Sequence, residues 1–281
     1  MSDPQRKTIG EYHVFLASPG DVNAADDPLH QLPPQPRDFT GREAELTDTP
    51  VDFVILTALQ EEFKAVTNSL PCVQQLPPNH DDDRVYFLSQ LPVTFPDGSL
   101  GQYRIVVLCL PNMGRVEASA ATNDAIRRWH PRFVLLFGIA GGIAEQGVQL
   151  GDVLISDQIV DYELQKIETD GPKIRYQVYR ASPRLLNAAT VFQDDAWIDR
   201  IRSKRPRKGK PARHVGPIAT GDKIIAFSDA LQKYRYHWPK MIGVEMKAGG
   251  AAHATFQTAN PPDFFMIRAV SDLGVRPSNT A

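Results

Sequence analysis

Several features that would assign this 281-residue chain to a specialised class of protein are scarce. It has only two cysteines, Cys72 and Cys109, which lie far apart and show no metal-ligand spacing. We therefore expect reduced thiols. The seven histidines include no pair at i and i+4 of the kind that binds zinc. These scarcities predict a protein without a metal site.

Long apolar runs and an excess of charge of one sign are missing as well. The longest apolar run, 133–143, contains three glycines and is shorter than the roughly 20 residues of a membrane-spanning helix. The formal net charge of -2 gives no general attraction to nucleic acid or anionic lipid. The first residues lack the apolar core of a secretory signal. We therefore expect a cytoplasmic protein with no nucleic-acid or membrane partner.

The composition of the chain changes near residue 50. A short strand and turn over 1–22 are followed by four prolines, which predict a linker over 23–50. Over 51–281, apolar strands alternate with helical segments, and this pattern predicts an α/β domain with a mostly parallel core. The expected strands span 51–57, 84–89, 103–110, 132–138, 152–162, 173–179, 241–244 and 263–270, and the expected helices span 61–69, 116–129, 183–192, 228–236 and 245–258.

A glycine-rich segment, Gly138-Ile139-Ala140-Gly141-Gly142, directly follows an apolar strand. Glycines at a strand end let a ligand approach the backbone and leave amides free to donate. The spacing differs from the dinucleotide fingerprint G-x-G-x-x-G, and no phosphate-binding Lys-Ser/Thr follows. This argues against a nicotinamide enzyme or a P-loop ATPase. Tight packing of strand against strand is the alternative explanation for these glycines.

Two carboxylates lie where strands end. Asp272 follows Ser271 at the exit of the apolar strand 264–270, where burial can raise the pKa of an acid. Glu62 follows Glu61 at the start of the helix after the first strand. Taken alone, Asp272 fits a helix N-cap better than a catalytic acid, and Glu62 fits a surface helix glutamate about equally well.

These residues belong to an ordered set of motifs at 58–62, 111–116, 137–142, 150–153, 218–222, 244–246 and 268–272. The set resembles the purine nucleoside phosphorylase / methylthioadenosine–adenosylhomocysteine nucleosidase superfamily. The resemblance implies an α/β fold, a three-layer α/β/α sandwich with a twisted mixed central sheet. It also implies an enzyme without cofactor or metal, and a homo-oligomer, usually a dimer.

The resemblance further implies cleavage of the bond between a purine base and its sugar, for which an acid must protonate the base. Asp272 matches the general acid of the family, Ser271 would orient it, and Glu62 matches the residue that positions the attacking water. The other residues that the resemblance places around the substrate are Ile139, Ala140, Gly141, Ile224, Ile225, Glu245, Met246 and Lys247.

Hydrolysis is favoured over phosphorolysis. A phosphorolytic enzyme must hold a phosphate dianion, which calls for arginine and hydroxyl donors. Related phosphorylases place such residues where this chain has Leu136 or Phe137, and Ile139. Arg115 could contact an anion or form a helix-end ion pair. We therefore expect a nucleosidase that acts on an adenine nucleoside or nucleotide, with a small-molecule substrate as its partner.

Three features depart from the family. Lys247 stands where members carry a glutamate that accepts hydrogen bonds from the ribose, and a lysine ammonium cannot accept them. This indicates weaker ribose binding or a phosphorylated substrate. The residues after Asp272 do not supply the family's final helix, and 14–22 and 36–43 resemble segments of bacterial defence proteins. The alternatives are an impaired nucleoside-binding or effector module and, third, a phosphate-dependent phosphorylase.

Overall fold

A computed structural model describes residues 51–77, 82–95, 97–169, 171–192, 195–201, 205, 208–222 and 234–273. The predicted segments 1–22 and 23–50 lie outside these residues, as do Ile224, Ile225 and most of the expected helix 228–236. The predicted absence of a final helix also concerns residues outside this range, so it stays a prediction.

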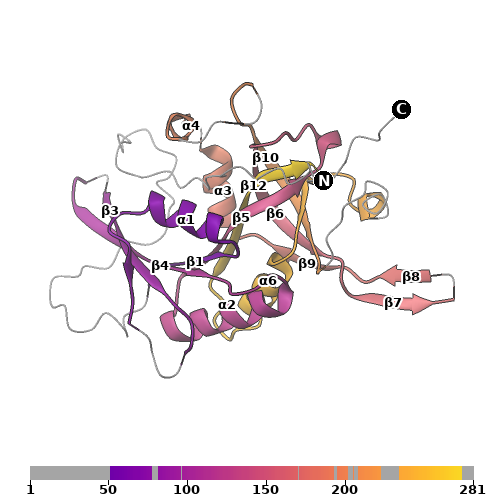
Figure 1. The fold of residues 1–281 in the computed structure, drawn as a ribbon, viewed down its shortest axis with the longest axis horizontal. Helices are drawn as coiled ribbons and strands as arrows, with labels where there is room; N and C mark the ends of the chain where they lie inside the picture. Colours follow the sequence, from indigo (N-terminus) through magenta and orange to yellow (C-terminus); the bar gives the residue numbers. More distant parts are fainter. Residues whose placement is uncertain are drawn as a thin grey trace, which may run out of the picture.

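The centre of the molecule is a mixed ten-stranded sheet in the order β2-β3-β4-β1-β5-β12-β6-β10-β11, with β9 beside β6 (Figure 1). Strands β4, β1, β5 and β12 run parallel, whereas β3 and β6 are antiparallel to their central neighbours. The strands are β1 Phe53–Thr57, β2 Gln74–Gln75, β3 Phe87–Thr94, β4 Leu100–Cys109, β5 Phe133–Gly142, β6 Val153–Asp161, β9 Gln177–Arg180, β10 Arg213–Thr220, β11 Gly243–Glu245 and β12 Asp263–Leu273. A separate hairpin, β7 Gln165–Glu168 and β8 Gly171–Ile174, projects from the body (Figure 1).

Helices cover both faces of the sheet. Helices α1 (Gln60–Ser69) and α3 (Pro183–Val191) lie on one face, and α2 (Arg115–Trp129) and α6 (Ala248–Phe256) lie on the other (Figure 1). Alternate residues of each strand enter the two cores, because side chains in a strand point to opposite faces in turn. This confirms the expected three-layer sandwich. Two short helices, η3 (Ala144–Gln146) and α4 (Ala196–Asp199), lie in connections.

The short strand β11 closes part of the sheet on itself. It runs parallel to β10, and it also pairs antiparallel with the end of β5, through Gly243 opposite Gly142 and Val244 opposite Gly141. Strands β5, β12, β6, β10 and β11 therefore form a ring. As a result, Glu245 at the end of β11 lies beside the carboxyl ends of β5 and β12, although it is more than a hundred residues from β5 in sequence.

Most expected elements are confirmed, but the ends of several strands differ. The glycine-rich segment 138–142 is strand, not the expected loop, because β12 and β11 both pair with its backbone. Strand β12 continues through Asp272 to Leu273, so Asp272 is not the N-cap of a helix. The expected strand 173–179 is divided between β8 and β9. These differences arise from pairing with distant strands, which overrides the local preference of glycine for turns.

Helices α2 and α6 approach closely enough to make Gly250 sensitive to substitution. All but two residues of α6 are buried, and a Cβ at Gly250 would lie 2.7 Å from the carbonyl carbon of Arg115. Backbone cannot move aside cheaply, so we expect Gly250→Ala to lower the free energy of unfolding by about 3 kcal/mol. Denaturant unfolding would measure this change. The control, Ala120→Ser on the exposed face of α2, should change it by less than about 0.5 kcal/mol.

Candidate active site

Glu62 lies at the start of α1, and its carboxylate is held by backbone amides from two strand ends. The Oε2 atom accepts hydrogen bonds from the N–H groups of Ala58 (2.7 Å) and Leu59 (3.0 Å), and Oε1 accepts one from Ile139 (2.8 Å). The residue is 1% exposed. A glutamate at the third position of a helix can reach back to its first amides and stabilise the start. Here that local motif also fixes the carboxylate against β5.

Arg268 is the cation at the centre of this site. It is fully buried on β12, opposite Gly138 of β5, and its Nη2 atom donates to Glu245 Oε2 at 2.6 Å. Its Nε and Nη1 atoms have no hydrogen-bond partner among the described residues. Buried polar groups are normally paired. These two atoms therefore point to a water or a ligand that completes the site.

Gly138 allows Glu62 and Arg268 to lie directly against the backbone of β5. A Cβ at this position would lie 2.6 Å from Glu62 Cδ and in close contact with Arg268 Nη1. Any side chain at residue 138 would thus displace the carboxylate or the guanidinium. The glycine therefore brings one anion and one cation close together beside the strand.

Glu245 and Lys247 bring a second anion and a second cation to the same place. Burial opposes the charge of Glu245, but Arg268 and Lys247 attract it, and the pKa of its carboxyl lies below the usual range. Its oxygens also accept from the backbone N–H groups of Lys247 and Ala248, both at 2.9 Å. For Lys247, burial and then the charge of Arg268 lower the ammonium pKa, against the opposing effects of Glu245 and Glu62. The four residues form one electrostatic cluster.

Asp272 and Ser271 lie further along the same glycine segment. Ser271 Oγ donates to Asp272 Oδ2 at 2.9 Å and lies 3.3 Å from the carbonyl oxygen of Ala140. A Cβ at Gly141 would lie 3.0 Å from Asp272 Oδ1. The expectation that Asp272 is buried is wrong, because its side chain is exposed. A register shift between Val270 and Asp272 re-aims the strand at this point.

The structure thus brings the predicted residues to one strand segment in two groups. Glu62, Glu245 and Lys247 gather around Arg268 at Gly138, whereas Asp272 and Ser271 gather at Gly141. Roughly 10 Å of strand separates the two glycines, at about 3.3 Å per residue. Of the other predicted residues, Ala140 is buried, and Ile139, Gly141 and Met246 are half-buried.

Sequence reasoning missed the role of Arg268. It lay within a recognised motif, but no function was predicted for it. The available signal was an arginine inside the otherwise apolar strand 264–270, because a fully buried arginine needs a partner or a ligand.

Two other charged motif residues have structural partners. Arg115 forms ion pairs with Asp161 (2.6 Å) and Asp222 (3.2 Å), which supports the ion-pair interpretation. Asp152 is buried and pairs with His214 (2.9 Å) and with Arg205, and so fixes the connection before β10. Arg205 is one of several basic residues that the sequence places between positions 202 and 213. Its charge is therefore used within the protein.

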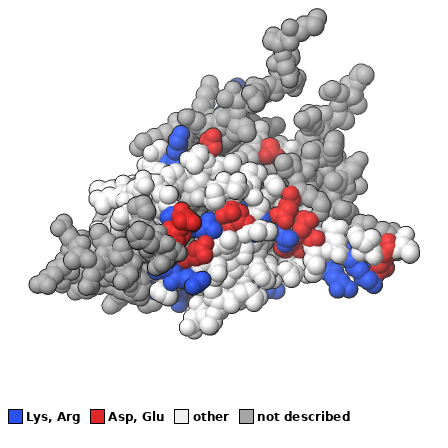
Figure 2. All heavy atoms as spheres, turned by 60° about the horizontal axis from the view of Figure 1, so that its bottom comes forward, with Lys and Arg blue, Asp and Glu red and all other residues white. Residues whose placement is uncertain are grey.

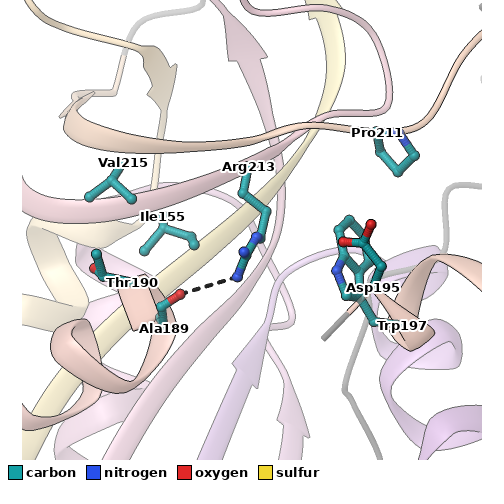
Figure 3. Close-up of a pocket in the computed structure, with 8 residues that line it drawn as sticks. All are labelled: Ile155, Ala189, Thr190, Asp195, Trp197, Pro211, Arg213 and Val215. Carbon is teal, nitrogen blue, oxygen red and sulfur yellow. Dashed lines mark hydrogen bonds between the residues drawn. The ribbon is translucent and has the colours of Figure 1, made fainter. Parts of the chain in front are cut away.

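A hollow on the α3 side of the sheet is separate from these residues. Its volume is about 310 Å³, and Arg213 in its wall donates to the carbonyl oxygen of Ala189 at 3.3 Å (Figure 3). The residues that line it are Ile155, Ala189, Thr190, Asp195, Trp197, Pro211, Arg213 and Val215. None of them is a predicted site residue.

Charges on the visible face of the molecule are mixed in sign. Acidic and basic side chains lie next to one another in Figure 2. Within the described residues, no helix is both long and apolar enough to cross a bilayer. No cluster of three or more side chains that could ligate a metal ion occurs among the same residues.

Solved structures similar to this chain share its fold. The 5′-methylthioadenosine/S-adenosylhomocysteine nucleosidase of Neisseria meningitidis, in complex with methylthio-immucillin-A, has a TM-score of 0.59 and 23% identity, covering 81% of this chain and 87% of that one. The nucleosidase of Colwellia psychrerythraea, in complex with adenine, has a TM-score of 0.60 and 22% identity, with 83% and 87% covered.

Proteins that are similar to this chain in sequence are also named as 5′-methylthioadenosine/S-adenosylhomocysteine nucleosidases. The 5′-methylthioadenosine/S-adenosylhomocysteine nucleosidase of Oceanobacillus iheyensis is 28% identical over 182 residues, or 63% of this chain and 72% of the relative. That of Staphylococcus aureus strain bovine RF122 is 27% identical over 219 residues, or 78% and 85%. The sequence profile of the phosphorylase superfamily matches residues 52–280, which include every described residue except Val51. This chain therefore belongs to the phosphorylase superfamily.

Proposed function

We propose that this protein hydrolyses the N-glycosidic bond of an adenine nucleoside or nucleotide. The observation that carries the proposal is the buried Glu62 carboxylate, held by three backbone amides against Gly138 and near Arg268. Membership of the phosphorylase superfamily and relatives named as nucleosidases support it.

In the proposed mechanism, Glu62 and Arg268 orient the attacking water. Glu62 Oε1 accepts one hydrogen bond, from Ile139, and an oxygen of this type has a second lone pair. Arg268 Nη1 has free donors beside the same glycine. A water between them would donate to the carboxylate and accept from the guanidinium. Glu62 would take its proton as the oxygen attacks the sugar.

Asp272 would protonate the leaving base. Ser271 donates to one of its oxygens, Oδ2, and the other, Oδ1, packs against Gly141 and is available to the base. Cleavage leaves positive charge on the ribose, which the carboxylates of Glu62 and Glu245 would stabilise because they are fixed before the reaction.

The environment of the water site favours hydrolysis over phosphorolysis. Leu136 and Phe137 are buried in the two cores, one on each face of the sheet, and neither can hold an anion. A phosphate dianion at Gly138 would also be repelled by Glu62. A neutral water meets no such repulsion.

A second candidate is a nucleoside-binding module without turnover. The exposure of Asp272 favours this alternative, since the expected acid lies in contact with solvent instead of in a buried site. The two candidates differ in product formation but not in ligand binding.

The test is an assay for free adenine. Purified protein would be incubated with adenosine, methylthioadenosine, adenosylhomocysteine and ATP, with and without inorganic phosphate, and the products separated by chromatography. We expect adenine and the free sugar in the absence of phosphate. Ligand binding without adenine release would support the binding module, and sugar 1-phosphate formed only with phosphate would support a phosphorylase.

The dimer and the cytoplasmic location stay predictions. Light scattering on the purified protein would measure its mass, and fractionation of cells would locate it.

A further inference from the structure

The cluster around Arg268 contains more hydrogen-bond donors than acceptors. The Glu245 carboxylate accepts from Arg268 Nη2 and two backbone amides, and Glu62 accepts from three amides, so each has few acceptor sites left. The Nε and Nη1 atoms of Arg268 have no hydrogen-bond partner in the described part of the chain. The nearly buried Lys247 brings further ammonium donors to the same two carboxylates. The unmet need is for an acceptor.

The burial of the Lys247 ammonium in this cluster is energetically unfavourable. The residue is only 4% exposed, and it faces Arg268 of β12, Glu245 of β11 and Glu62 of α1. Burial and the like charge of Arg268 both work against its ammonium, and the two carboxylates compensate only in part. A bound group with further negative charge would stabilise the ammonium and offset its unfavourable burial.

We propose that Lys247 and Arg268 bind a phosphate group carried on the sugar of the substrate, which makes the preferred substrate an adenine nucleotide. A phosphate offers several acceptor oxygens, and the donors of a guanidinium and an ammonium suit it better than they suit ribose hydroxyls. This inference rests on the proposed function, because it assumes that the sugar lies at Gly138.

The position of Glu62 separates this site from that of the attacking water. The water would lie between Glu62 Oε1 and Arg268 Nη1, next to a carboxylate that repels anions. Lys247 lies at the start of α6, two residues after Glu245. A phosphate that is attached to the sugar and held by Lys247 would therefore lie toward α6.

The test measures binding apart from turnover. Calorimetry in phosphate-free buffer would compare adenosine with its 2′-, 3′- and 5′-monophosphates, and inorganic phosphate in a separate titration. We expect one monophosphate to bind at least about tenfold tighter than adenosine. Lys247→Met should remove about ten- to a hundredfold of that affinity, and Lys247→Arg should retain most of it. The loss of adenosine affinity in Lys247→Met should be clearly smaller than the loss of monophosphate affinity.

Lys166→Met is the matched control, because Lys166 is 56% exposed on the projecting hairpin and pairs with Glu168. It should change no affinity. Should Lys247→Met fail to fold, Lys247→Gln and the preference of the unmodified protein still test the inference. Equal affinity for adenosine and all monophosphates would overturn it, as would an equal loss for all ligands in Lys247→Met.

Failure of this inference can be told from failure of the proposed function. Adenine release with no preference for a phosphorylated sugar would overturn only the phosphate site. Lys247-dependent nucleotide binding without adenine release would overturn only the hydrolase. Lys247-dependent binding of inorganic phosphate alone would support the phosphate site, with free phosphate as its ligand, and would replace hydrolysis by phosphorolysis.

Discussion

Replacing Glu62 by glutamine is expected to slow adenine release by about a hundred- to ten-thousandfold, the usual contribution of a general base. The amide cannot take a proton from water. Its NH₂ group would also face backbone N–H donors at Ala58 and Leu59 or at Ile139, where only acceptors fit. Initial rates at saturating substrate, with chromatographic detection of adenine, would measure the loss.

Glu61 provides the control for this substitution. It is the preceding residue on α1, and its side chain is exposed. Glu61→Gln removes the same charge from the neighbouring residue but should change the rate less than about twofold. An equal loss in both variants would indicate a general effect of charge and contradict the assigned role of Glu62.

Asp272→Asn should likewise reduce adenine release by about a hundred- to ten-thousandfold, because asparagine has no proton to give to the base. Its effect on stability should be less than about 0.5 kcal/mol, since the side chain is exposed. Thermal unfolding and enzyme assays on the same preparation would separate the two effects.

The leaving group distinguishes the acid from the base. A riboside with a p-nitrophenol leaving group departs without protonation, so Asp272→Asn should cleave it at nearly the rate of the unmodified protein. Glu62→Gln should remain slow on both substrates. Asp263→Asn, at the other end of β12, is the control and should match the unmodified protein. Slow cleavage of the activated riboside by Asp272→Asn would argue against its role as acid.

The sequence predicted the order of the elements well, and the reason is local. The β-branched run before Thr57 and the alanine-rich segment before Trp129 have the periodicity of a strand and a helix, and both formed where expected. The glycine-rich segment had no such periodicity. Whether it forms a loop or a strand depends on β11 and β12, which are more than a hundred residues away.

The candidate site was also predicted only in part from the sequence. Glu62 lies in a local helix-start motif that the sequence displays, and the structure places it beside the glycines. The roles of Arg268 and Lys247 could not be read locally, since a lysine at a helix start is ordinarily exposed. Arg268 and Lys247 come close together only because β11 pairs with the end of β5.

The amino-acid sequence by itself determined the alternation of strands and helices and the carboxylates at the strand ends, because these depend on periodicity and on neighbouring residues. Only the tertiary structure decided that two cations and two carboxylates share one buried cluster and that Asp272 lies exposed. The reason is that ring closure by β11 and the register shift in β12 arise from pairings between distant segments, which no local pattern encodes.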